Sequence, residues 1–242
     1  MNKEHFIRNY KKAFGKYELP IVFWYSDKPV GNCNKTEHCF IKDLNAARKG
    51  KLISFGAETI SCGGGRVYTG FSEPLPHIKD FVSIKECYKQ SPEMVTRFID
   101  DLEMPDMRGK YINFVSIDKV EDLDACVGLI FFATPDVLAG LVSWVMYDTD
   151  DPAAVTVPFG SGCSSMVAKT LVEHLRGGNQ TFLGLFDPSV RPRVDRNVLS
   201  LAIPMSRFKQ MYHTLEACCL KGTPAWKKVK ERIEREEMAD IY

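Results

Sequence analysis

The chain of 242 residues has no long apolar run, and this lack excludes two classes of protein. Its first residues alternate charged and apolar side chains, so they lack the uninterrupted apolar stretch of a secretion signal. The most apolar segment, residues 126–146, is interrupted by Thr134, Pro135 and Asp136 and predicts a buried strand and helix rather than a membrane span. These features predict a cytoplasmic protein.

The chain also lacks an excess of charge of either sign. Its 32 basic and 31 acidic residues leave a formal net charge of +1, which argues against binding to nucleic acid or to a membrane surface. Apolar residues make up 45% of the chain and charged residues 26%, as is usual in globular proteins. We therefore expect a small molecule as the binding partner, and a homodimer is expected only from the general frequency of dimers.

Familiar catalytic and cofactor motifs are missing as well. No lysine follows the glycines as in a Walker loop, and no GxGxxG fingerprint occurs. The eight cysteines do not form the paired CxxC motifs of a zinc ribbon. No complete motif therefore specifies a reaction, and whether the protein is an enzyme stays open.

Strand and helix patterns alternate along the chain. Runs of β-branched and aromatic residues predict strands at 20–25, 51–55, 66–71, 111–117, 127–132, 155–158, 181–186 and 198–203. Helical spacing and capping residues predict helices at 2–17, 36–48, 91–102, 134–147, 164–176, 206–220 and 224–238. We predict an α/β (or α+β) fold, with a mixed β-sheet and flanking helices in a single domain of residues 1–242. The first and last of these helices are expected to pack outside the core.

Two stretches of the chain are similar to each other. Residues 21–27 look like residues 129–134, and each copy continues through a helix to a Phe-Gly pair and a small-residue loop with one cysteine. These similarities predict two degenerate αβ halves at about 20–103 and 124–220, related by pseudo-symmetry. The two cysteine loops would then lie at related positions; chance similarity between apolar strands is the alternative.

The loop Gly160-Ser161-Gly162-Cys163-Ser164 is the sharpest local feature, because it lies between a predicted strand and a predicted helix. Glycines such as Gly160 and Gly162 permit close backbone approach, and a helix N-terminus, here at Ser164, offers free N–H groups to an anion or a thiolate. Cys163 is therefore a candidate reactive or ligating thiol. The alternative is a tight turn in which the cysteine packs inward and Ser164 caps the helix.

Three further features contain candidate residues. Cys62 precedes three consecutive glycines, which implies close approach of a ligand or of another backbone, or a mobile loop. Cys39 follows His38 in a predicted helix, where a single cysteine is more often a core residue. The turn of residues 187–193 combines Asp187 with Arg191 and Arg193; it can clamp an anion or form an internal salt bridge.

Several separated motifs, in order along residues 20–210, resemble an uncharacterised prokaryotic family, domain of unknown function 169. The motifs are His38-Cys39-Phe40, Ala46-Ala47-Arg48-Lys49-Gly50, Cys62-Gly63-Gly64, Gly70-Phe71, Phe132-Ala133-Thr134-Pro135-Asp136, Gly160-Ser161-Gly162-Cys163 and Gly184-Leu185-Phe186-Asp187-Pro188-Ser189-Val190-Arg191. The family brings no established activity with it.

The resemblance implies that Cys39, Cys62 and Cys163 fall at motif positions, whereas Cys33, Cys218 and Cys219 do not. Three such thiols suit an iron–sulfur cluster or another soft metal. The alternatives are a binding module for an anionic metabolite, with Gly160, Gly162, Ser164, Asp187, Arg191 and Arg193 as ligand-binding residues, or a thiol enzyme with Cys163 as nucleophile. The metal-site hypothesis depends on whether folding brings these three thiols into one pocket.

Overall fold

The fold is built on one mixed sheet, seen in a computed structural model that describes residues 1–105 and 109–239, with side chains described to residue 236. The single domain expected over 1–242 thus includes short stretches outside the described residues. The strand order is β2-β3-β1-β4-β7-β6-β5, and the β5–β6 pair is parallel while the others are antiparallel. The strands are β1 (Ile21–Ser26), β2 (Ile53–Gly56), β3 (Tyr111–Ser116), β4 (Gly128–Ala133), β5 (Val155–Thr156), β6 (Thr181–Gly184) and β7 (Leu199–Pro204). The α/β fold class with a mixed sheet is confirmed.

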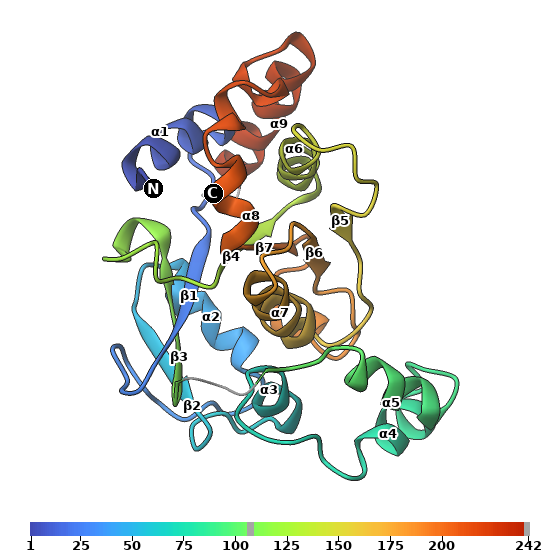
Figure 1. The fold of residues 1–242 in the computed structure, drawn as a ribbon. Helices are drawn as coiled ribbons and strands as arrows, with labels where there is room; N and C mark the ends of the chain where they lie inside the picture. Colours follow the sequence, from blue (N-terminus) through green and yellow to red (C-terminus); the bar gives the residue numbers. More distant parts are fainter. Residues whose placement is uncertain (106–108, 240–242) are drawn as a thin grey trace.

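Helices cover both faces of this sheet (Figure 1). Because side chains alternate along a strand, Leu129 and Phe131 of β4 face one layer while Ile130 and Phe132 face the other. The first layer holds α1 (Lys3–Phe14), α6 (Pro135–Val145), α8 (Met205–Met211) and α9 (Pro224–Ala239). The second holds α2 (Phe40–Arg48), the π-helical turn η3 (Ser164–Ala168) and α7 (Lys169–Leu175).

The two terminal helices contribute to the core of the first layer. On α1, Phe6 and Phe14 are buried against the sheet. On α9, Trp226 and Ile233 are buried in the same cluster. The rings of Phe14 and Trp226 meet edge to face at 5.4 Å, so α1 and α9 hold each other as well as the sheet.

The strand expected at residues 66–71 is wrong, because this segment is the helix α3 (Gly63–Tyr68) followed by a turn. A Cβ on Gly65 would lie 2.9 Å from Ile60 and 3.2 Å from Phe40. Close packing against these side chains therefore favours the glycine-rich helix over its poor intrinsic propensity. The internal repeat itself stays a prediction.

Two predicted helices are shorter than expected. Helix α2 begins at Phe40 rather than Thr36, whose hydroxyl instead accepts a hydrogen bond of 3.0 Å from the backbone N–H of Ser61. The helix expected at 206–220 ends at Met211 and continues as the 3₁₀ turns η5 (Thr214–Glu216) and η6 (Cys219–Lys221). Among the others, α5 (Pro92–Asp100) begins as predicted, with Ser91 as its N-cap.

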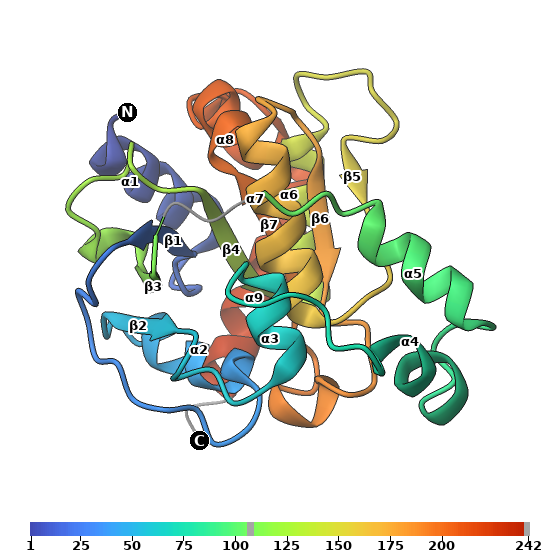
Figure 2. The same cartoon turned by 60° about the horizontal axis from the view of Figure 1, so that its bottom comes forward.

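One excursion leaves the layered body between α3 and β3. It contains α4 (Ile78–Asp80), the π-helical turn η1 (Phe81–Lys85) and α5. Figures 1 and 2 both show α4 and α5 at one end of the molecule, away from α1. Phe81 and Ile84 are exposed here, and Val95 is the buried side chain of α5. None of the described helices has the length and apolar character needed to cross a bilayer.

Candidate functional site

Each of the three motif cysteines immediately precedes a helix. Cys39 is the N-cap residue of α2, Cys62 that of α3 and Cys163 that of η3, which continues into α7. The prediction that Cys39 lies within a helix is thus wrong by one residue, because α2 starts late. Cys39 and Cys62 have extended backbone angles and lie beside the first N–H groups of a helix. Cys163 already has helical backbone angles, and the N–H groups of Ser164 and Ser165 bond the carbonyl oxygen of Ser161.

These cysteines line one pocket on the side of the sheet covered by α2 and α7. Its volume is about 420 Å³, and its lining is Glu37, His38, Cys39, Ser61, Cys62, Gly64, Ser161, Gly162, Cys163, Ser189, Val190 and Arg193. The residues come from three segments that are distant in the sequence. Folding therefore brings together the three thiols that the family motifs singled out, in a space we call the thiol pocket.

Burial keeps the Cys39 and Cys163 thiols protonated when nothing is bound to them. The pKa of Cys39 is raised from an ordinary 9.0 to about 11, chiefly by burial and also by nearby Cys62 and Asp187, while a backbone hydrogen bond from Ile41 and the charge of Arg193 lower it. Burial also raises the pKa of Cys163, with Cys39 and Cys62 adding to the effect and a hydrogen bond with Ser161 opposing it. Thiolates in this pocket would repel one another, so a bound cation is needed to stabilise them together.

Polar contacts orient two of the sulfur atoms. The backbone N–H of Gly65 donates a hydrogen bond of 3.4 Å to Cys62 Sγ. Cys163 Sγ and Ser161 Oγ lie 3.2 Å apart and share a hydrogen bond. A sulfur that accepts N–H or O–H groups is better able to carry negative charge, which suits a metal-ligating thiolate.

We expect iodoacetamide to label the metal-free protein fastest at exposed Cys87 and slowly at Cys39 and Cys163. The thiolate is the reacting species, and a pKa of about 11 leaves Cys39 about a hundredfold less thiolate at pH 8 than the ordinary value would. Its labelling rate should rise with pH until about pH 11. Peptide mass spectrometry over a time course measures each rate.

The same time course in a denaturing concentration of urea is the control, since it should bring the rates of all cysteines close together. Rapid, selective labelling of Cys163 in the folded protein at neutral pH would contradict this prediction. It would instead indicate an activated nucleophile and favour the thiol-enzyme hypothesis.

The predicted ligand-binding loop residues are held by contacts within the protein. Ser164 Oγ donates to the carbonyl oxygen of Ser161 at 2.7 Å. A Cβ on Gly160 would lie 2.6 Å from the Phe98 ring, and one on Gly162 would lie 3.1 Å from Leu185. The glycines therefore permit close approach of side chains from other segments, and Gly162 also lines the thiol pocket.

The three charged side chains of the turn at residues 187–193 lie in different environments. Arg191 donates to the backbone carbonyl groups of Leu185, Val198 and Arg196, so its guanidinium holds the loop rather than facing the pocket. Arg193 lines the thiol pocket. Asp187 is buried and accepts from the Ser189 hydroxyl and, at 3.2 Å, from the Val190 N–H. The two arginines therefore do not form a shared clamp.

The remaining cysteines lie outside the thiol pocket. Cys126 and Cys218 are buried, as their apolar surroundings predict. Cys87 is exposed in the loop after η1 and has a positive φ of 54°. All eight cysteines are free thiols. Across residues 1–105 and 109–239, no three His, Cys, Asp or Glu side chains converge closely enough to hold a single metal ion.

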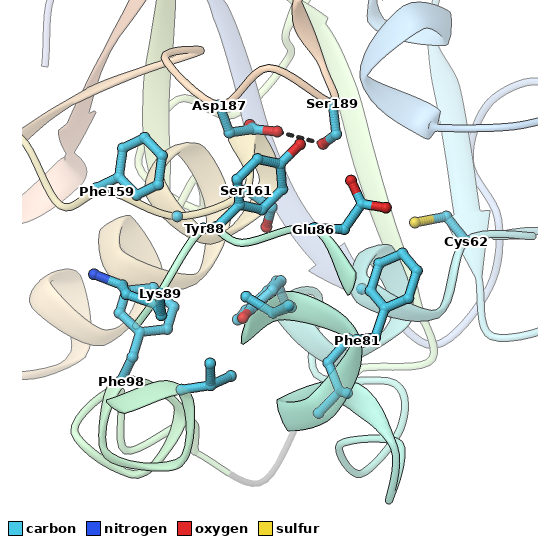
Figure 3. A pocket seen from close by; sticks show the side chains of 16 residues that line it. Cys62, Phe81, Glu86, Tyr88, Lys89, Phe98, Phe159, Ser161, Asp187 and Ser189 are labelled. Atoms are coloured by element: carbon cyan, nitrogen blue, oxygen red, sulfur yellow. Dashed lines mark hydrogen bonds between the residues drawn. The ribbon is translucent and has the colours of Figure 1, made fainter. Parts of the chain in front are cut away.

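A second pocket, of about 340 Å³, adjoins the first and was missed by the sequence reasoning (Figure 3). The two share Cys62, Gly64, Ser161 and Ser189. Much of the wall of this second pocket comes from residues 78–98, whose apolar side chains follow no known motif. A cysteine next to three glycines was the available signal, since Cys62 and Gly64 border both pockets.

Comparison with known proteins identifies the family. The family model described as "Uncharacterised ArCR" matches residues 13–214, which include all three cysteines of the thiol pocket. Neither the curated proteins nor the solved structures contain a match to the chain. Because the match covers well over half of the sequence, the chain belongs to this family, domain of unknown function 169.

Proposed function

We propose that the protein binds an iron–sulfur cluster through Cys39, Cys62 and Cys163. The observation that carries this proposal is that three cysteines, each preceding a different helix, line one pocket. Cysteine thiolates are the usual protein ligands of such clusters. A cluster of several irons suits this pocket better than a single ion, because its ligating sulfurs do not have to meet at one point.

The electrostatics of the thiol pocket favour an anionic cluster. Backbone N–H groups act on two of the sulfurs: Gly65 donates to Cys62 Sγ, and a backbone hydrogen bond from Ile41 lowers the pKa of Cys39. Arg193 adds a positive side chain to the lining. These groups would offset the charge of three thiolates and the cluster, which burial alone makes unfavourable.

Three cysteines leave one iron of a four-iron cluster without a protein thiolate. Glu37 and His38 also line the thiol pocket, and either side chain can serve as the fourth ligand. If neither does, that iron is free to bind a small molecule. The proposal therefore concerns binding of the cluster, and a redox or enzymatic reaction would be a further property.

Anaerobic reconstitution with iron and sulfide tests the proposal. We expect the wild-type protein to retain about four irons per chain and to show a broad absorption band near ~400 nm. Cys39→Ser, Cys62→Ser and Cys163→Ser should each lower the bound iron and bleach the band. Cys33→Ser is the matched control, because Cys33 is partly exposed and lies outside the thiol pocket.

Circular dichroism of each variant separates loss of the cluster from loss of the fold. Less than a tenth of an iron per chain in folded, anaerobically reconstituted wild-type protein would overturn the proposal. So would equal iron retention by the Cys33 variant and by all three pocket variants.

A further inference from the structure

The second pocket has the apolar lining of a small-molecule site, and we call it the aromatic pocket. Its lining comes from α3 and the residue before it, from the excursion containing α4, η1 and α5, from the segment before η3 and from the turn after β6. Aromatic residues dominate the lining: Tyr68, Phe81, Tyr88, Phe98 and Phe159. A volume of about 340 Å³ lies at the small end of the range for ligand pockets, so the occupant is a small molecule.

The aromatic pocket contains a buried carboxylate oxygen without a partner. The Asp187 side chain, 3% exposed, lines the cavity and lies beside Ser189 in Figure 3. Its Oδ1 accepts from the Ser189 hydroxyl and the Val190 N–H, but its Oδ2 is buried with no hydrogen-bond partner among the described residues. A buried, unpaired carboxylate oxygen is costly, and a ligand that donates to it would remove this cost.

Together with Asp187, the other charged groups of the lining give the aromatic pocket a net negative charge. Glu86 provides a second carboxylate, and Figure 3 shows it directed into the same space. Lys89 is the lining's basic residue, but its ammonium group already lies over the rings of Phe98 and Phe159, 5.9 and 5.7 Å from their centroids. Lys89 thus demonstrates that these rings accept a cation.

We propose that the aromatic pocket binds a small organic cation, an amine with an aromatic or other apolar body, whose ammonium group donates to Asp187 Oδ2. The apolar body would pack against the rings, and Glu86 would add a second favourable charge. This ligand class differs from the anionic metabolite considered from the sequence, because Arg191 holds backbone carbonyls instead of facing a cavity. The inference goes beyond the proposed function and holds with or without a cluster.

The shared wall sets where such a ligand would lie. Cys62, Gly64, Ser161 and Ser189 border both pockets, so a molecule in the aromatic pocket would lie next to the thiol pocket. If the cluster binds as proposed, the amine would be a neighbour of it. We assign no reaction to this proximity.

Isothermal titration of metal-free protein with three probes of similar shape tests the charge preference. The probes are 2-phenylethylamine, 2-phenylethanol and 3-phenylpropionate. We expect the amine to bind at least tenfold more tightly than the alcohol, and the carboxylate to bind most weakly. Because no metal is present, failure of cluster reconstitution does not affect this result.

Asp187→Asn tests the residue assignment, since it keeps an oxygen for the Ser189 and Val190 contacts and removes the charge. It should weaken binding of the amine at least tenfold and change binding of the alcohol little. Glu86→Gln, at a partly exposed position, should weaken binding of the amine by a smaller factor. It replaces Asp187→Asn as the test of the charge preference if the Asp187 variant does not fold. Asp195→Asn is the control, because Asp195 pairs with Arg48 outside the aromatic pocket.

Two results would overturn the inference. One is equal or tighter binding of the carboxylate probe to the wild-type protein, or no binding of the amine at millimolar concentration. The other is an unchanged preference for the amine in both folded Asp187→Asn and folded Glu86→Gln proteins.

Discussion

Replacement of Gly140 by valine is expected to lower the free energy of unfolding by about 3 kcal/mol. Gly140 lies on α6 where α9 crosses it, and a Cβ there would lie 2.3 Å from Trp226 Cη2 and 2.9 Å from Phe14 Cε1. The Trp226 ring is buried, and its Nε1 donates to the carbonyl oxygen of Ala13 at 3.0 Å. It therefore cannot move without breaking the contact that fixes α9 to α1.

Urea unfolding followed by circular dichroism measures this effect. Ala139→Val is the matched control, because Ala139 neighbours Gly140 on α6 and is exposed. That variant loses only helix propensity and should change the free energy of unfolding by less than about 1 kcal/mol. Equal stabilities of the two variants would show that α9 does not pack closely on α6.

Arg207→Leu is expected to have a similarly large effect, about 3 kcal/mol of lost stability. Arg207 on α8 is 3% exposed, donates to the carbonyl oxygen of Val145 at 2.8 Å and forms an ion pair with Asp148. The substitution leaves this carbonyl without its donor and the Asp148 carboxylate without its counter-charge. Because the Arg207 guanidinium is buried and its removal leaves the Val145 carbonyl oxygen without this donor, the loss exceeds that of a surface ion pair, although Asp148 itself is partly exposed.

The double variant Arg207→Leu with Asp148→Leu should recover part of the stability, since it removes the unpaired carboxylate. Arg176→Leu is the control for an exposed pair, with Glu103, and should cost no more than about 1 kcal/mol. A cost for Arg207→Leu equal to that of Arg176→Leu would contradict the interpretation of Arg207 as a structural charge.

The layered fold was predictable because its strands carry strong local signals. The apolar run of β4 and the Thr134-Pro135 helix start specify a buried strand followed by α6. Residues 66–71 have the same β-branched and aromatic composition but form α3, because the contacts of Gly65 with Phe40 and Ile60 come from other segments. Packing of this kind leaves no signal in a local window.

The candidate site was only partly predictable, because it is also formed by segments that are distant in the sequence. Local sequence placed Cys163 before a helix, whereas Cys62 was expected in a glycine loop before a strand. Spacing along the chain says nothing about whether their thiols line one pocket. The arrangement of α2, α3 and η3 brings them together. The role of Arg191 depended on carbonyl groups up to seven residues away, and the sequence alone could not distinguish these from a bound anion.

The packing of α9 against α1 has a consequence for synthesis of the protein. Phe14 on α1 meets Trp226, more than two hundred residues later, and Lys230 reaches the carbonyl oxygen of Lys12 at 3.0 Å. A chain growing on the ribosome can bury Phe6 and Tyr10 against Trp144 and Phe131, but Phe14 lacks its contact with Trp226 until α9 has been translated. Packing of α1 in the first layer is therefore complete only after α9 has left the ribosome.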